Sequence, residues 1–347
     1  MSLISVSVLR KNIAALFEGA GLSLENSDIV TDILLDAEIS GITTHGISMV
    51  PAHIEKLHNN SYSVNGQLEF ERDGTGFTIF NANNMIGMLS AYKAMEKAIT
   101  LSCGNGIQLV LCNHANTYSA GAYYVKMAVK KGLIGIAACN APAQMAPLGG
   151  KEKLLGTNPF SIGVPAKNEA PFIFDMATSI VAKSKINEII RNGRDTIPDG
   201  WATDSAGNPT TNPLEAVKGM ILPMAGAKGY GLCMSIDILA GLLSGAAYLD
   251  KVGRFYPLEN GCMNVGHSFI TIDPKVLYGE KFYEDMDKYL NRIRSSESAS
   301  GRKIIAPGDD KQAITRQNTE NGLNVSDRLK DEFDSLAKEL RIETLNW

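Results

Sequence analysis

The chain of 347 residues is long enough for two compact units, or for one large core with an added lobe. Hydrophobic residues make up 44% and charged residues 20%, a composition typical of globular proteins. The formal net charge of −4 shows no surplus of basic residues. This balance argues against a nucleic acid or an anionic membrane as partner.

The amino-terminal stretch is apolar only at helical spacing, and Arg10, Lys11 and Glu18 interrupt it, so we expect no signal peptide. No run of about 18 apolar residues is present to span a bilayer. The five cysteines are scattered and lack CxxC spacing, which indicates reduced thiols and no zinc site. We therefore expect a soluble cytoplasmic protein that requires no metal.

The first 45 residues predict two helices. Apolar residues recur at helical spacing between Leu9 and Phe17, and the sequence GAGLS then interrupts the pattern. Ser23 can cap a second helix, which we expect to end at Gly41. A third helix is expected over residues 51–57.

From about Gly76, segments typical of strands alternate with segments typical of helices. Strands are predicted at residues 77–82, 107–112, 133–141, 171–179 and 268–273, and helices at residues 88–103 and 120–132. This alternation favours an α/β fold with a sheet covered on at least one face. The stretch 229–249 is apolar nearly all round, which predicts a helix buried on most sides.

The carboxyl-terminal part returns to helical patterns, with an apolar stripe over residues 329–340 behind the candidate cap Ser326. We expect an α/β mixed-sheet domain over residues 76–280, together with a helical lobe made from both chain ends. The lobe would comprise residues 1–75 and 281–347.

The standard nucleotide-binding motifs are missing from the sequence. No GxGxxG follows a strand, and neither GxxxxGK[ST] nor GxSxG occurs, which disfavours a Rossmann fold, a P-loop and a serine hydrolase. Glycines instead gather around Gly149, around Gly229 with Lys228 beside it, and at Gly308. Glycines at a helix start suit a diphosphate, although helix packing and turns explain them equally well.

Several long segments resemble the malate/L-lactate dehydrogenase family that lacks a Rossmann fold. Its members include ureidoglycolate, sulfolactate and 2,3-diketogulonate oxidoreductases and a cyclic-imine reductase. The resemblance covers nearly the whole chain, and its marks include THGISMVPAHIEKL, FDMATSIVAKSKI, PMAGAKGYGLCMSIDILAGLLSGA, VGHSFITIDP and APGDDK.

The resemblance implies a non-Rossmann NAD(P)-binding domain, hydride transfer to a small 2-oxo or 2-imino carboxylate, and a homodimer. NAD and NADP remain alternatives as the cofactor. The family's cofactor positions fall on Asp175, Met176, Ala177, Thr178, Ser179, Ala227, Lys228, Gly308, Asp309 and Asp310.

The turn that carries Thr44 and His45 lies where the second predicted helix ends. In the family this turn reads Ser-His-Gly, and the resemblance implies that the histidine donates a proton while the neighbouring hydroxyl orients it. Histidine suits this role near neutral pH, and a hydroxyl partner can fix its tautomer. The competing interpretation is that His45 only caps the preceding helix.

Two positions depart from the family pattern. Met49 stands where members carry an arginine, and methionine cannot grip a substrate carboxylate. Thr117 stands where many members carry a catalytic histidine, and it cannot act as an acid or base near neutral pH. His114 lies three residues upstream and could replace that group, although a surface or strand-end role is favoured.

Four positions complete the expected substrate side: Met49, His53, Tyr118 and Asn140. Because an acid–base group and a carboxylate clamp are both missing, we expect an altered substrate, such as an imine, or lost activity. An iminium ion accepts hydride without a proton being delivered to oxygen. The alternative is a catalytically altered or inactive relative that binds NAD(P) or a metabolite as a sensor or partner subunit.

Overall fold

A seven-stranded mixed sheet forms the centre of the computed structural model, which describes residues 2–258, 261–299, 301–343 and 345–347. Neighbouring strands are antiparallel except for the third and fourth strands of the chain, which run parallel. The mixed sheet confirms the predicted fold class. From edge to edge the strands are β2 (Glu69–Gly74), β3 (Phe77–Asn81), β4 (Ile107–Ala115), β11 (Val265–Ile272), β5 (Ile134–Cys139), β6 (Phe160–Val164) and β7 (Phe172–Met176).

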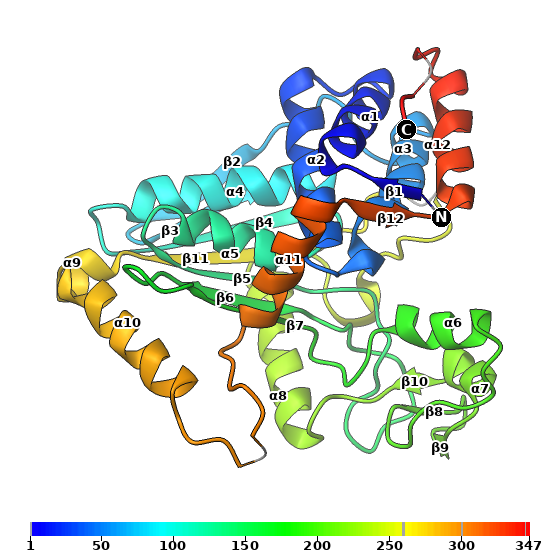
Figure 1. Ribbon diagram of the computed structural model, residues 1–347. Coiled ribbons are helices and arrows are strands. Elements are labelled where there is room, and N and C mark those ends of the chain that lie inside the picture. The colour runs from blue at the N-terminus through cyan, green and yellow to red at the C-terminus, as the bar shows by residue number, and fades with distance from the viewer. Residues whose placement is uncertain (1, 259–260, 300, 344) are drawn as a thin grey trace.

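Helices cover both faces of this sheet (Figure 1). On one face, α4 (Gly87–Ser102) packs on β4 and β11, and α5 (Ala122–Val129) packs on β5 and β6. On the other, α8 (Ala227–Ile236) continues into a π-helical segment, η3 (Asp237–Leu242), which packs on β11 and β5.

The two chain ends pair with each other. Strand β1 (Ser2–Ile4) runs antiparallel to β12 (Leu323–Val325), with Leu3 opposite Asn324. Serine caps begin three of the neighbouring helices, because each hydroxyl accepts a backbone N–H of the first turn. These helices are α1 (Val6–Gly19), α2 (Leu24–Ile39) and α12 (Asp327–Glu339), and α3 (Val50–His58) packs beside them.

A second, smaller core lies within the segment predicted as one domain. It contains Met145, Leu155, Ile186 and Ile221 among its buried side chains. Around it lie α6 (Lys183–Arg191), β8 (Ala202–Thr203), β9 (Pro209–Thr210), α7 (Pro213–Lys218) and β10 (Met220–Ile221).

Two helices follow β11. Helices α9 (Pro274–Tyr278) and α10 (Lys281–Arg294) lie beside the sheet, and Asp287 of α10 accepts backbone N–H groups of residues 167–169 in the β6–β7 turn. The domain boundary after residue 280 stays a prediction. Helix α11 (Asp309–Asn321) leads back to the lobe, where Asn318 donates to the Ile39 carbonyl of α2.

The apolar helix expected over residues 229–249 is correct in type and wrong in burial. Its outer face exposes Met234, Ile238, Leu239, Leu242 and Leu243, each by between 39% and 55%. One side covers the sheet, and the opposite side faces solvent in the single chain. Among the described residues, no helix is both long and apolar enough to cross a membrane.

Candidate active site

The turn that carries the candidate proton donor folds back closely onto α2. It consists of two short 3-10 segments, η1 (Thr43–His45) and η2 (Ile47–Met49), joined at Gly46. A side chain at Gly46 would collide with the Glu38 carboxylate, and only glycine fits there. That carboxylate, 9% exposed, accepts the backbone N–H of Ile47 at 3.0 Å.

The hydrogen bond expected between the two candidate residues is present. Thr44 Oγ1 lies 2.9 Å from His45 Nδ1. When Nδ1–H donates to the hydroxyl, Nε2 of the neutral ring carries no proton and is left free to accept one from a substrate. Ser119 Oγ donates to the His45 carbonyl at 2.7 Å, so a second segment of the chain fixes the position of the turn.

Asp175, at the end of β7, acts on His45 electrostatically. Burial raises the pKa of Asp175, while hydrogen bonds from Ser161 Oγ (2.6 Å) and from the Ala122 N–H at the start of α5 lower it. The pKa of His45 is lowered by its removal from water, and the Asp175 charge opposes this effect. The His45 side chain nevertheless keeps an exposed edge, so the ring is partly enclosed and still accessible.

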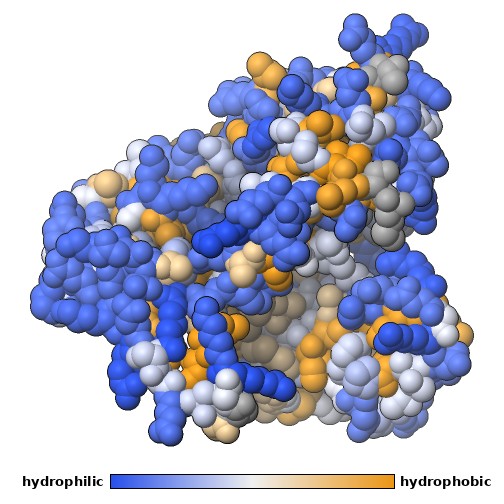
Figure 2. Space-filling model, in the orientation of Figure 1, coloured by the Kyte–Doolittle hydropathy of each residue, from blue (hydrophilic) through white to orange (hydrophobic). Residues whose placement is uncertain are grey.

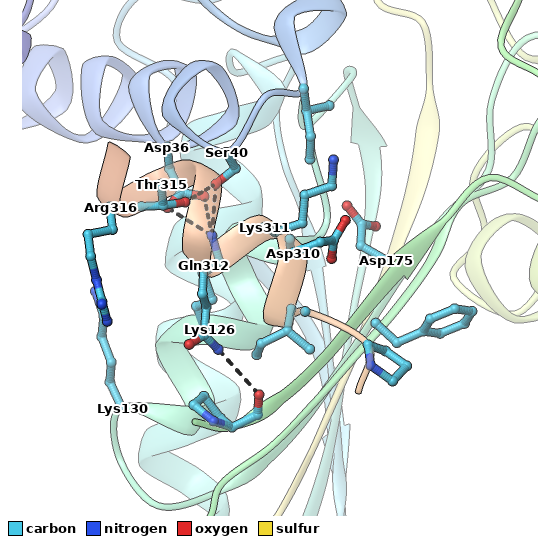
Figure 3. A pocket seen from close by; sticks show the side chains of 17 residues that line it. Asp36, Ser40, Lys126, Lys130, Asp175, Asp310, Lys311, Gln312, Thr315 and Arg316 are labelled. Carbon is cyan, nitrogen blue, oxygen red and sulfur yellow. Dashed lines mark hydrogen bonds and ion pairs between the residues drawn. The ribbon is translucent and has the colours of Figure 1, made fainter. Parts of the chain in front are cut away.

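Beside Asp175 lies a cavity of about 590 Å³ between α2, α5, β7 and α11. Three of the predicted cofactor residues, Asp175, Gly308 and Asp310, line it. Figure 3 shows Asp175, Asp310 and Lys311 around one end of the cavity. Lys126 of α5 forms an ion pair with Asp36 of α2 across another wall, with Nζ 2.9 Å from Oδ2.

The three predicted cofactor segments all meet at β7 and its continuation. Gly308 packs against Ile173, whose N–H donates to the Pro307 carbonyl at 3.2 Å. The Met224 N–H, which belongs to the segment leading to Ala227 and Lys228, donates to the Thr178 carbonyl at 2.9 Å. Ala227 and Lys228 are exposed at the start of α8. The fold therefore brings together residues that are 46 and 134 positions apart in the chain.

Three of the predicted cofactor side chains form hydrogen bonds with other groups of the protein. The Thr178 hydroxyl donates to the Thr157 carbonyl, and the Ser179 hydroxyl donates to the Val181 carbonyl. Both residues are buried, whereas Met176 and Ala177 are half-buried. The Asp309 carboxylate is bound by Arg294. At these three positions the side chain already has a hydrogen-bond partner within the protein.

The predicted substrate residues divide into one near the turn and three in the core. Met49 ends η2 and is half-buried. His53 Nδ1 lies 3.2 Å from Tyr62 Oη, and the Asn140 amide bonds three internal groups. Tyr118 stacks on Tyr124, with ring centroids 5.1 Å apart. His53, Asn140 and Tyr118 are at most 2% exposed in the single chain, and their contact with a substrate stays a prediction.

The two positions on the expected acid–base side lie at the end of β4. His114 is exposed and has a φ of +46°, and its Nδ1 lies 2.9 Å from Asn113 Oδ1. Thr117 is half-buried in the connection to α5. Their roles stay predictions. No cluster of three or more His, Cys, Asp or Glu side chains suited to a metal occurs among the described residues.

Sequence reasoning missed the groups that hold the His45 turn and Asp175. Glu38 and Ser119 bond the turn, and Ser161 bonds Asp175, each across to another segment. Gly46, eight residues after Glu38, was the only local sign that the turn approaches α2 closely. Ser119 and Ser161 required the folded chain.

Comparison with known proteins shows the family and the fold. The model of the malate/L-lactate dehydrogenase family matches residues 4–334. Malate/(S)-sulfolactate dehydrogenase of Methanothermus fervidus is 35% identical over 346 residues, which cover 99% of this chain and 100% of that protein. Ureidoglycolate dehydrogenase (NAD(+)) of Escherichia coli O157:H7 is 32% identical over 89% of this chain and 88% of that protein. The structure of sulfolactate dehydrogenase from Methanocaldococcus jannaschii, 32% identical, superimposes with a TM-score of 0.92 over 98% of both chains.

Proposed function

This chain belongs to the malate/L-lactate dehydrogenase family, and we propose that it reduces a small 2-oxo or 2-imino carboxylate with His45 as the proton donor. It is an oxidoreductase that uses NAD or NADP. The relatives named above act on malate, sulfolactate or ureidoglycolate, all small carboxylates.

The observation that carries this proposal is the placement of the Thr44–His45 pair beside Asp175. Asp175 belongs to both parts of the site, because it acts on His45 and also lines the cavity where two of the three cofactor segments meet. A cofactor held in that cavity would place its reactive end next to the histidine.

The residues present fit a dinucleotide. Helix α11 begins at Gly308, where φ is +99°, and no side chain caps it among the described contacts. Uncapped N–H groups at a helix start suit a phosphate oxygen, so Gly308 and Asp310 would hold the diphosphate through the backbone. Lys228 would contact the cofactor from the start of α8. When bound, NAD(P)H supplies the hydride that reduces the substrate carbon.

His45 handles the proton. In the reductive direction the imidazolium donates from Nε2 to the developing alkoxide, while Thr44 holds Nδ1. The Asp175 charge stabilises the imidazolium. In the oxidative direction the neutral ring accepts a proton from the substrate hydroxyl, and the lowered pKa favours this form.

Met49 and Thr117 favour an imine over a 2-oxo acid as substrate. Neither side chain can supply the charge or the proton that the family's arginine and histidine would supply. An imine needs its proton on nitrogen, where His45 would deliver it, and none on an oxygen. We expect cyclic imines to be reduced in a panel that also contains pyruvate and oxaloacetate. Activity confined to those two acids would rule out this choice of substrate.

The test of the donor is His45→Ala. Turnover should fall by roughly two orders of magnitude or more, the usual scale for a general acid. Cofactor affinity should stay nearly unchanged, because His45 does not line the cavity. Thr44→Val should give a smaller loss, since it removes only the orienting hydroxyl. Turnover of His45→Ala close to that of the wild type would refute the assignment.

A second candidate function follows from the same two departures: the chain could bind NAD(P) or a metabolite without turnover, as a sensor or partner subunit. Calorimetric titration with NADH and NADPH separates the two. Tight binding with no turnover on any substrate of the panel would favour this second function. Turnover on any of them would exclude it.

We further propose a cytoplasmic homodimer. The apolar side chains on the outer face of α8 and η3 are exposed, and Figure 2 shows a hydrophobic area in a hollow near the lower middle of the molecule, where Figure 1 places α8. A contiguous apolar surface of this kind suits the same surface on a second copy. The five cysteines are all unpaired, which fits a reducing compartment.

A further inference from the structure

We propose that Arg294 is a positioning residue for the cofactor, and that Asp309 serves as its partner and not as a cofactor ligand. Arg294 ends α10, and Asp309 begins α11 immediately after the candidate phosphate-binding glycine Gly308. The inference rests on the proposed function, since it concerns how that cofactor cavity is shaped.

The contact between the two side chains is bidentate. Arg294 Nε donates to Asp309 Oδ2 at 3.0 Å, and Arg294 Nη2 donates to Asp309 Oδ1 at 2.7 Å. Both side chains are only 17% exposed. A paired guanidinium and carboxylate fix distance and orientation together, which a lysine cannot do. The pKa of Asp309 is accordingly lowered, chiefly by Arg294.

Arg294 also binds the turn that leads into β7. Its Nη1 donates to Glu169 Oε2 at 2.9 Å, and its Nη2 donates to the Ala170 carbonyl at 3.1 Å. Asn291, one helical turn earlier, donates to the other oxygen of Glu169 at 3.0 Å. One guanidinium therefore joins three segments: the end of α10, the β6–β7 turn and the start of α11.

This junction fixes the wall of the cavity. Asp309 Oδ2 also accepts the Ala306 N–H at 2.8 Å, which folds the connection before Gly308 onto the start of the helix. Gly308 then packs against Ile173 so closely that a Cβ would come within 2.9 Å of the Ile173 carbonyl oxygen. Gly308 and Asp310 line the cavity, whereas Asp309 does not, because its side chain is bound to Arg294.

The contact between Arg294 and Asp309 matters because the described residues of the connection between α10 and α11, 295–299 and 301–308, form no helix or strand. Without the ion pair, the end of this connection would sample several positions, and the N–H groups of α11 would lose their fixed direction toward a phosphate. A displacement of about 1 Å at a binding group is enough for a large loss. Arg294 therefore acts on affinity and leaves the reacting atoms untouched.

The test measures NADH and NADPH affinity by calorimetry in Arg294→Gln, Asp309→Asn and the double variant, beside turnover at saturating cofactor and thermal unfolding. Each single variant should weaken binding by roughly tenfold or more, with turnover at saturation changed by less than about twofold. The double variant should be no worse than Arg294→Gln alone, since the arginine change has already removed the contact that Asp309→Asn removes. Arg294→Lys, which keeps the charge without the bidentate geometry, should fall between.

Arg328→Gln is the matched control, because Arg328 pairs with Glu332 on α12 and is 81% exposed. It should bind cofactor like the wild type. If folded Arg294→Gln binds the cofactor as tightly as the wild type, the proposed role of Arg294 is refuted while the proposed function stands. Loss of affinity in Asp309→Asn with none in Arg294→Gln would also refute that role, since Asp309 would then contact the cofactor. A wild type that binds neither nucleotide would overturn the proposed function as well.

Discussion

Replacement of Glu38 by glutamine should make the protein more stable than the wild type above neutral pH. Glu38 lies beneath the His45 turn, where burial raises its pKa from 4.5 to about 7 and the hydrogen bond from Ile47 lowers it only in part. Because the folded state holds this proton more tightly than the unfolded chain, the associated stability is complete below pH 4.5. It is lost as the pH rises toward 7.

The size of the effect follows from the same values. A tenfold change in proton affinity corresponds to about 1.4 kcal/mol, so a pKa change from 4.5 to about 7 sets an upper limit of about 3.4 kcal/mol. Glu38 retains 9% exposure, and relaxation with entry of water reduces the cost of the charge. We expect roughly 1–2 kcal/mol. Glutamine removes the charge and still offers Ile47 an oxygen acceptor.

Urea unfolding at pH 5, 6, 7 and 8 measures this effect. The difference between Glu38→Gln and the wild type should shift in favour of the variant by that amount from the lowest to the highest pH. Glu18→Gln on α1 is the control, because Glu18 is exposed and should give a difference that does not change with pH. A constant difference for Glu38→Gln would refute the reasoning that the folded protein buries a carboxyl whose proton is held more tightly.

Two further changes test the site and the assembly. Asp175→Asn removes the charge that stabilises the imidazolium, so reductive turnover should fall by about tenfold or more and its pH profile should move to lower pH; an unchanged profile in steady-state assays would contradict this role. Ile238→Glu places a charge within the exposed apolar face of η3 and should convert the proposed dimer to monomer in light scattering. Leu214→Glu, at a 57% exposed position on α7, should leave the dimer intact, and equal behaviour of the two variants would contradict the assigned surface.

Local signals predicted much of this molecule correctly. Ser23 and Ser326 accept N–H groups of the first helical turn as their positions indicated. Thr44 and His45 are neighbours in the chain, so their hydrogen bond needed only the turn to form. Helix capping and short-range hydrogen bonds depend on residues that are close together in the chain, so they can be predicted from the sequence.

Long-range relations could not be predicted in the same way. Asp175 acts on a histidine 130 positions earlier, and nothing in either segment indicates that meeting. Asn140 and Tyr118 match expected site positions in sequence, yet the core holds both side chains. The apolar stretch that includes Ile238 predicted burial without indicating what covers it. Each case depends on tertiary or quaternary contacts that a pattern along the chain does not encode.

The position of β11 restricts how the chain can reach its native state. This strand hydrogen-bonds β4 on one side and β5 on the other, although both precede it by more than a hundred residues. During synthesis, the chain must therefore leave the ribosome as far as residue 272 before β11 can pair with β4 and β5. Until then both strands expose unpaired edges that invite aggregation, and a fragment cut before residue 265 would keep them permanently. Because β11 is synthesised after the strands that flank it, we expect the protein to depend on chaperones during synthesis.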